Sequence, residues 1–239
     1  MSTRLDKNQL QSDLVVSTWT EKHPLAKYVA PFACFFLFLA FSPQHLDNYW
    51  ALPIWVLVLA AVCFICWPRE LSIYPRYPLA SIAVGALVFF LWIAPDVLIS
   101  GYRQNIFFSN SVTGHLHSSL RPAELQSAWI LSWRTIRAVL IVPVVEELFW
   151  RGWLMRWLIN TDFQKVPLGA YSPLAFWISA LLFASEHGPY WDVGLLAGIV
   201  YNLWMVRTKS LADCILMHAV TNGILSSYVM ASGQWQYWQ

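Results

Sequence analysis

The segment Leu140-Ile-Val-Pro-Val-Val-Glu-Glu-Leu-Phe-Trp-Arg-Gly-Trp-Leu154 places two adjacent glutamates, Glu146 and Glu147, inside an otherwise apolar run. A charged side chain at the centre of a bilayer costs a few kcal/mol on insertion scales, and it needs a partner or a hydrated cavity. Ionisable residues inside membrane segments therefore mark functional sites. The segment predicts a membrane helix that carries such a site.

The composition of the whole chain indicates a protein that crosses the membrane several times. Hydrophobic residues make up 58% and charged residues 12% of its 239 residues, and the mean hydropathy is +0.49. Soluble domains contain about 25% charged residues, so this chain has about half the usual charge. The 15 tryptophans and 10 tyrosines fit aromatic belts at the two membrane surfaces. A net charge of +2, with the basic residues scattered, argues against nucleic-acid binding.

Seven apolar segments come close to the length of about 20 residues that a helix needs to cross the hydrocarbon core. They are residues 25–42, 50–67, 78–100, 135–158, 172–187, 190–206 and 210–231. The sequence from Arg121 to Arg134 predicts an amphipathic helix at the membrane surface that leads into the fourth span. The predicted fold class is all-α, a polytopic transmembrane helix bundle of about seven spans plus this interfacial amphipathic helix.

We expect one membrane domain with three parts: a polar N-terminal segment (1–24), scaffold spans with the interfacial helix (25–134), and a helical core (135–239) that carries the polar residues of interest. Most lysines and arginines fall on the cytoplasmic side when the N-terminus is placed inside. Arg134 and Arg137 are exceptions, because they stand at the entrance of the fourth span on the disfavoured side. The positive-inside rule therefore predicts a cytoplasmic N-terminus.

Glu147 and Arg151 are four residues apart and share one face of the predicted helix. This spacing predicts a hydrogen-bonded ion pair, which lowers the cost of burying both charges. Glu146 points about a quarter turn away and remains available to a cavity, where a carboxylate can act as a general base. These residues alone leave a second interpretation open, in which both glutamates and the arginine form a buried triad that only fixes helix packing.

Two later apolar segments carry further polar residues at helical spacing. Phe183-Ala-Ser-Glu-His187 ends the fifth span, and His218-Ala-Val-Thr-Asn222 puts a histidine and an asparagine on one face of the seventh. Unpaired in an apolar bundle, each polar group would cost several kcal/mol of desolvation, so we expect them to cluster around shared water. A glutamate with an imidazole can take a proton from that water. A histidine and an asparagine amide can stabilise the oxyanion formed when it attacks a peptide carbonyl.

Other residues near these segments have simpler interpretations. We expect Glu186 and Asp192 to be solvated at the outer surface rather than to act as partners of a histidine. Gly194 and Gly198 predict a close-packing face on the sixth span. Pro143 is expected to weaken the backbone hydrogen bonds of its helix and to kink it.

At these residues the sequence resembles the CPBP family of intramembrane proteases, which includes the endoprotease that trims prenylated CAAX proteins. The family's motifs are Glu-Glu-x-x-x-Arg, Phe-x-x-x-His and His-x-x-x-Asn/Asp, each on its own transmembrane helix. Here they stand in family order as 146–151, 183–187 and 218–222. The resemblance covers roughly residues 135–231.

The resemblance implies an intramembrane glutamic endopeptidase of the CPBP type that needs no metal or other cofactor. It would cut a membrane-associated or lipidated protein substrate within the lipid bilayer, and the expected location is a bacterial inner membrane. The site residues that it implies are Glu146, His187, His218 and Asn222 for catalysis, with Glu147, Arg151 and Phe183 in support.

The implied roles are specific. Glu146 would activate the water with the help of His187, while His218 and Asn222 would form the oxyanion site. Glu147 and Arg151 would position their helix, and Phe183 would support the packing.

Two other functions remain open. A zinc peptidase could use His187, His218 and a glutamate as ligands, because three such ligands and a water complete a catalytic zinc site. The asparagine beside His218 favours the oxyanion role instead. A non-catalytic membrane scaffold or immunity-type binder could retain the same fold, but a suitable residue at every motif position argues against it.

Overall fold

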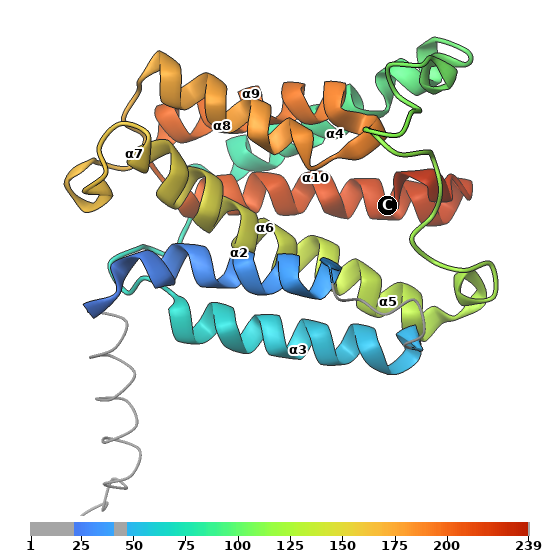
Figure 1. The fold of residues 1–239 in the computed structure, drawn as a ribbon, viewed down its shortest axis with the longest axis horizontal. Helices are drawn as coiled ribbons and strands as arrows, with labels where there is room; N and C mark the ends of the chain where they lie inside the picture. Colours follow the sequence, from blue (N-terminus) through green and yellow to red (C-terminus); the bar gives the residue numbers. More distant parts are fainter. Residues whose placement is uncertain (1–21, 41–46, 239) are drawn as a thin grey trace, which may run out of the picture.

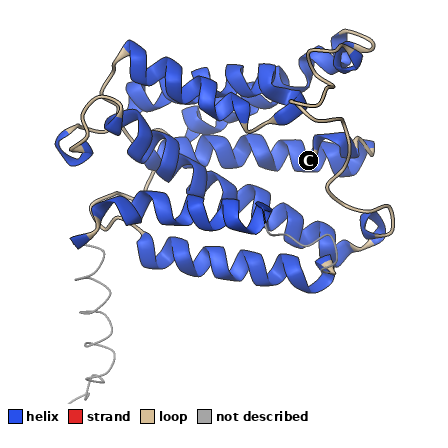
Figure 2. Ribbon diagram, viewed as in Figure 1, coloured by secondary structure: helices blue, strands red, loops and turns tan. Residues whose placement is uncertain are grey.

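The computed structural model describes residues 22–40 and 47–238, and within these ranges it contains helices and loops but no β-strand (Figure 2). The predicted polar segment 1–24 lies almost entirely outside the described residues. The helices are α2 (Pro24–Ala40), α3 (Asn48–Cys66), α4 (Pro78–Leu98), α5 (Ala128–Ile136), α6 (Val142–Glu147), α7 (Met155–Trp157), α8 (Pro173–Ser185), α9 (Trp191–Thr208) and α10 (Leu211–Ser232). The predicted all-α bundle is confirmed.

Each predicted span corresponds to a helix. The fourth span corresponds to one continuous helix, Ala128–Trp157, which consists of α5, α6, α7 and the turns between them. We call it the long helix. By length and composition, Asn48–Cys66, Pro78–Leu98, Leu211–Ser232 and the long helix can cross a membrane, while α2 and α8 are apolar but shorter. The chain is thus an integral membrane protein.

The predicted interfacial helix is not a separate element. Glu124–Gln126 forms one 3-10 turn, and Ala128 already begins the long helix. Ser127 caps this start, since its side chain accepts a hydrogen bond from the N–H of Ile130. The amphipathic segment is therefore divided between a turn and the first part of the fourth span.

The long helix crosses the bundle obliquely (Figure 1). On one side of it lie α2 and α3, which pack side by side, and on the other side lie α8 and α9. Between these pairs, α10 packs against α4 and against the middle of the long helix. The long helix therefore touches both halves of the bundle, and its central residues are covered from several directions.

Glycines allow α9 to approach its neighbours closely, as predicted. A Cβ on Gly198 would stand 3.2 Å from the Cα and the carbonyl oxygen of Ala180 in α8, and a Cβ on Gly194 would stand 3.1 Å from the Cγ of His187. A side chain at Gly198 would press on the backbone of α8, and one at Gly194 would press on the His187 ring. This close approach holds His187 against α9.

The long helix widens in two π-helical turns, Arg137–Ile141 and Leu148–Leu154, one on each side of α6. In the first turn the N–H of Val142 donates to the carbonyl of Arg137, five residues back. Pro143 has no N–H, so the carbonyl of Ala138 lacks a backbone donor. Isolated π-turns often occur at functional sites, and here they enclose the six residues that end in Glu146 and Glu147.

Candidate active site

Glu147 and Arg151 form the predicted ion pair, and both are fully buried. Nη1 of Arg151 donates to Oε1 of Glu147 over 3.1 Å. The guanidinium also donates from Nε to Oδ1 of Asn202 over 2.9 Å and from Nη2 to the carbonyl of Gly198 over 3.3 Å. These bonds tie the long helix to α9 and balance the charge of Glu147.

Asn202 was not predicted from the sequence, although it is fully buried at the centre of this network. Its Nδ2 donates to the carbonyl of Phe176 over 2.8 Å and to Oγ of Ser179 over 2.9 Å, while its Oδ1 accepts from Arg151. The side chain thus joins α8, α9 and the long helix. The available signal was a lone amide one turn after Gly198 in an apolar span.

Phe183 packs against both Arg151 and His187. Its ring is 1% exposed, the guanidinium carbon of Arg151 stands 4.6 Å from the ring centre, and the His187 ring centre is 4.7 Å away. A cation over an aromatic face is stabilised by the ring's quadrupole. The ring therefore supports both groups without taking part in hydrogen bonding.

His218 bridges the two adjacent glutamates. Its Nδ1 lies 2.9 Å from Oε1 of Glu147, and its Nε2 lies 4.0 Å from Oε2 of Glu146. Because a carboxylate only accepts hydrogen bonds, the Nδ1 carries a hydrogen. The Oε2 of Glu146 is buried and has no hydrogen-bond partner among residues 22–40 and 47–238. A carboxylate oxygen in this state is suited to hold a water or a substrate group.

His187 follows α8 and presents its other nitrogen to the site. Its Nδ1 lies 2.7 Å from the carbonyl of Phe183, one turn earlier, so that nitrogen donates and Nε2 is left to accept a proton. The protein backbone thereby fixes both the tautomer and the orientation of the ring.

Asn222 compensates for the missing N–H of Pro143. Its Nδ2 donates over 2.8 Å to the carbonyl of Ala138, the carbonyl that has no backbone donor. One amide hydrogen and the Oδ1 remain for other contacts. Asn222 therefore both stabilises the π-helical turn and offers a donor to the site.

One cavity of about 780 Å³ collects the predicted catalytic residues, with Glu146, His187, His218 and Asn222 all in its wall. Phe183 also lines it, whereas Glu147 and Arg151 lie behind the wall. The side chains come from the long helix, from the end of α8 and from α10. The chain thus brings the three sequence motifs together around one space.

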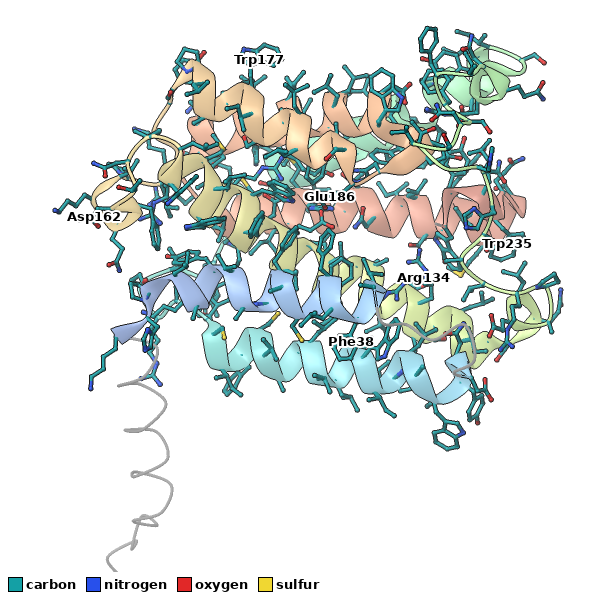
Figure 3. All side chains as sticks on the ribbon, in the orientation of Figure 1. Phe38, Arg134, Asp162, Trp177, Glu186 and Trp235 are labelled. Atoms are coloured by element: carbon teal, nitrogen blue, oxygen red, sulfur yellow. The ribbon has the colours of Figure 1, made fainter. Side chains whose placement is uncertain are left out.

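The expectation that Glu186 is solvated at the surface is wrong. Glu186 lines the same cavity, and its Oε1 is buried without a hydrogen-bond partner in the described part of the chain. Figure 3 shows its side chain near the middle of the bundle. The reason is that α8 ends at Ser185, so the residues after it fold back over the bundle instead of continuing outward.

The expectation for Asp192 is also wrong, because this carboxylate is paired. It accepts hydrogen bonds from Arg103 and, over 3.0 Å, from the hydroxyl of Tyr102. Arg103 donates as well to Asp96 at the end of α4, over 2.8 Å. Asp192 therefore anchors the loop after α4 to the start of α9.

The geometry gives no support to a zinc site within the described ranges. No group of three or more histidine, cysteine, aspartate or glutamate side chains is arranged there to hold a metal ion. His187 and His218 both direct Nδ1 at protein oxygens, and their Nε2 atoms share the cavity with carboxylates.

Residues 127–224 match a family model described as type II CAAX prenyl endopeptidase Rce1-like. The matched region begins at the cap of the long helix and contains all three motifs. Comparisons with curated proteins and with solved structures give no match. The family resemblance predicted from the motifs is confirmed for residues 127–224, whose sequence is similar to that of CAAX-type intramembrane proteases.

Proposed function

We propose that this chain, whose residues 127–224 match the family of type II CAAX prenyl endopeptidases, is an intramembrane glutamic endopeptidase that cuts a membrane-associated protein. One observation carries the proposal. Among the described residues, one carboxylate oxygen of Glu146 has no hydrogen-bond partner, and Glu146 lines a cavity together with two histidines and an asparagine. This is the inventory that hydrolysis of an amide by an activated water requires.

Glu146 is the general base in this proposal. A water held at its free Oε2 gives up a proton to the carboxylate as its oxygen attacks the peptide carbonyl. His187, with Nε2 available as an acceptor, orients the same water. When the tetrahedral intermediate collapses, Glu146 returns the proton to the leaving amine, so the carboxylate is regenerated.

His218 and Asn222 stabilise the oxyanion. Asn222 retains one amide hydrogen after its bond to Ala138. In this proposal His218 offers an Nε2–H to the oxyanion, while its Nδ1 donates to Glu147 and its Nε2 lies 4.0 Å from Oε2 of Glu146. Each donor to such an oxyanion contributes roughly 10²–10³-fold to the rate in other hydrolases.

The alternative of a triad that only fixes packing does not account for Glu146. The buried network consists of Glu147, Arg151 and Asn202, whose hydrogen bonds join the helices. Glu146 is linked to this network only through His218, at 4.0 Å among the described residues, and it lines the cavity. Burying a carboxylate in an apolar bundle costs free energy, and packing does not explain why Glu146 is at this position, which favours a functional role.

One wall of the cavity suits a lipid chain. It is apolar and largely aromatic, and it forms where α2 meets the long helix. The residues of this wall are Phe32, Phe35, Phe36, Leu39, Phe149, Trp150 and Trp153. We propose that the substrate is lipidated, as the name of the matched family suggests, and that its hydrocarbon lies here.

We further propose a cytoplasmic N-terminus. The start of α2, the loop after α3, the loop after α7 and the end of α9 all lie at one end of the bundle (Figure 1). Lys27, Arg69, Lys165, Arg207 and Lys209 belong to these segments. Basic residues favour the cytoplasmic side. A reporter enzyme that works only outside the cytoplasm should therefore be active when it is fused after residue 239.

A cleavage assay tests the function. The purified protein in lipid nanodiscs is incubated with a prenylated peptide that ends in a CAAX sequence, and the products are identified by mass spectrometry. We expect cleavage by the wild type, retained after exhaustive chelation, and a loss of roughly 10²–10⁴-fold in kcat for Glu146→Gln, the range for a general base. Glu70→Gln is the matched control, because Glu70 is exposed and its partners among residues 22–40 and 47–238 are Lys27 and Tyr28, outside the cavity. Turnover of Glu146→Gln within threefold of the wild type would falsify the assignment, and loss of activity on chelation would favour the zinc peptidase.

A further inference from the structure

The cavity extends along the long helix well beyond Glu146. The positions of this helix that line the cavity include every fourth residue: Arg134, Ala138, Val142, Glu146, Trp150 and Leu154. Arg137 lines it as well, nine residues before Glu146, which is roughly 13 Å along a helix. In Figure 3, Arg134 lies towards the end of the bundle where α5 begins, away from Glu186 near the middle. The cavity thus has a basic end apart from its carboxylates.

Arg137 is a buried cation for which residues 22–40 and 47–238 provide no counter-ion. Its side chain is 8% exposed, and no hydrogen bond or ion pair links it to any residue in 22–40 or 47–238. Its aromatic contact is weak, with the guanidinium carbon 6.0 Å from the ring centre of Trp55, at the limit for a cation–π interaction. Burying a charge without a partner costs several kcal/mol. The site therefore calls for an anion that the described residues do not supply.

Arg134 lines the same end of the cavity. It lies three residues earlier on the same helix, is 8% exposed, and packs its guanidinium 5.2 Å from the ring centre of Trp238. The aromatic wall contributed by α2 belongs to the same cavity. A ligand that fills the space therefore has a hydrocarbon part, a reacting bond near Glu146 and a negative charge at Arg137.

We propose that Arg137 binds the free carboxylate at the C-terminal end of the peptide segment that the enzyme releases. This inference rests on the proposed function. The distance of roughly 13 Å equals about four residues of extended chain, so a short segment beyond the scissile bond reaches from Glu146 to Arg137. The planar fork of a guanidinium matches a carboxylate in a two-point contact.

A lipid phosphate fits the position less well. Arg137 stands nine residues inside the long helix from Ala128, roughly 13 Å from its start, and the cavity that it lines also holds Glu146. A phosphate of a bilayer lipid lies at the surface instead, and nothing would connect it to the reacting bond. A carboxylate on the substrate itself explains both the depth of Arg137 and its place in the same cavity.

Two peptides that differ only at the C-terminus test the proposal. The prenylated CAAX peptide is prepared as the free acid and as the C-terminal amide, and both are assayed in nanodiscs of zwitterionic lipid. We expect the wild type to prefer the acid at least tenfold in kcat/KM, and this ratio to fall towards one in Arg137→Gln. Arg137→Lys, which keeps the charge but not the fork, is expected to keep part of the preference. Arg207→Gln, which alters an exposed arginine at the end of α9, should retain all of it.

A binding assay separates this inference from the proposed function. Fluorescence anisotropy of labelled acid and amide peptides is measured on Glu146→Gln, with and without Arg137→Gln. Tighter binding of the free-acid peptide than of the amide, lost when Arg137 is replaced, supports the anion site. This holds even if the wild type cleaves neither peptide and the proposed function fails. Equal binding and equal cleavage of acid and amide by the wild type overturns the site while leaving the protease intact. An acid preference that survives in both Arg137→Gln and Arg137→Lys also overturns it.

Discussion

Replacing Arg151 by methionine should destabilise the protein by about 3–5 kcal/mol, the usual cost of removing one partner of a buried ion pair. Methionine keeps much of the side-chain volume but supplies none of the hydrogen bonds to Glu147, Asn202 and Gly198. The carboxylate of Glu147 then stays buried with His218 as its remaining partner. For a chain of this size each kcal/mol shifts Tm by about 2–4 °C, so a fall on the order of 10 °C follows.

Thermal unfolding of the purified protein in detergent, followed by tryptophan fluorescence, measures this change. The double variant Glu147→Gln/Arg151→Met removes both charges and should recover at least half of the loss, because no uncompensated charge remains. Arg207→Met, at an exposed arginine, should leave Tm within about 1 °C, as surface substitutions usually do. A Tm for Arg151→Met close to that of the wild type, or a double variant as unstable as the sum of the two single changes, would refute the reasoning.

Two further predictions concern separate parts of the chain. Asn222→Ala should lower kcat roughly 10²–10³-fold through loss of an oxyanion donor, and should lower stability by about 1–3 kcal/mol because the carbonyl of Ala138 loses its donor. Adding Pro143→Ala restores a backbone N–H as a donor to the carbonyl of Ala138. The double variant should therefore regain stability in thermal unfolding but should not regain turnover. Recovery of turnover would show that Asn222 only supports the turn. Burial raises the pKa of the Glu124 carboxyl, but hydrogen bonds from Arg121 and Asn48, together with the charge of Arg121, lower it by more, so the pKa lies below its usual value of 4.5. Glu124→Gln should therefore lower stability at pH 7 and lose this effect as the pH falls below the unfolded-state value near 4.5; an effect of equal size at pH 3 and pH 7 would contradict the ionic contribution.

The helical arrangement and the identity of the site residues could be predicted because both depend on local spacing. Glu147 and Arg151 pair because residues four apart share a helix face, and the same spacing aligns His218 with Asn222. A polar group in an apolar span must also find partners, which indicated that the motifs meet.

The environments of single residues depended on contacts that spacing does not contain. The side chain of Glu186 turns inward because α8 stops at Ser185, and helix ends are the least certain part of a sequence-based prediction. Asn202 completes the partners of Arg151 from a helix whose orientation is set by packing. Arg137 stood out from its sequence only as a basic residue on the disfavoured side of the membrane.

The two wide turns of the long helix decide which of its residues face the same way. In a regular α-helix of 3.6 residues per turn, positions four apart rotate by about 40° at each step, so Arg134 and Leu154 would point to nearly opposite sides. The π-helical turns hold more residues per turn and cancel much of this rotation, which keeps every fourth side chain on the cavity wall. Deleting one residue between 137 and 141 would let a regular helix form there and would swing Arg134 away from the axis on which Glu146 lies. The angular alignment of the basic end with the acidic centre thus depends on a single additional residue in the chain.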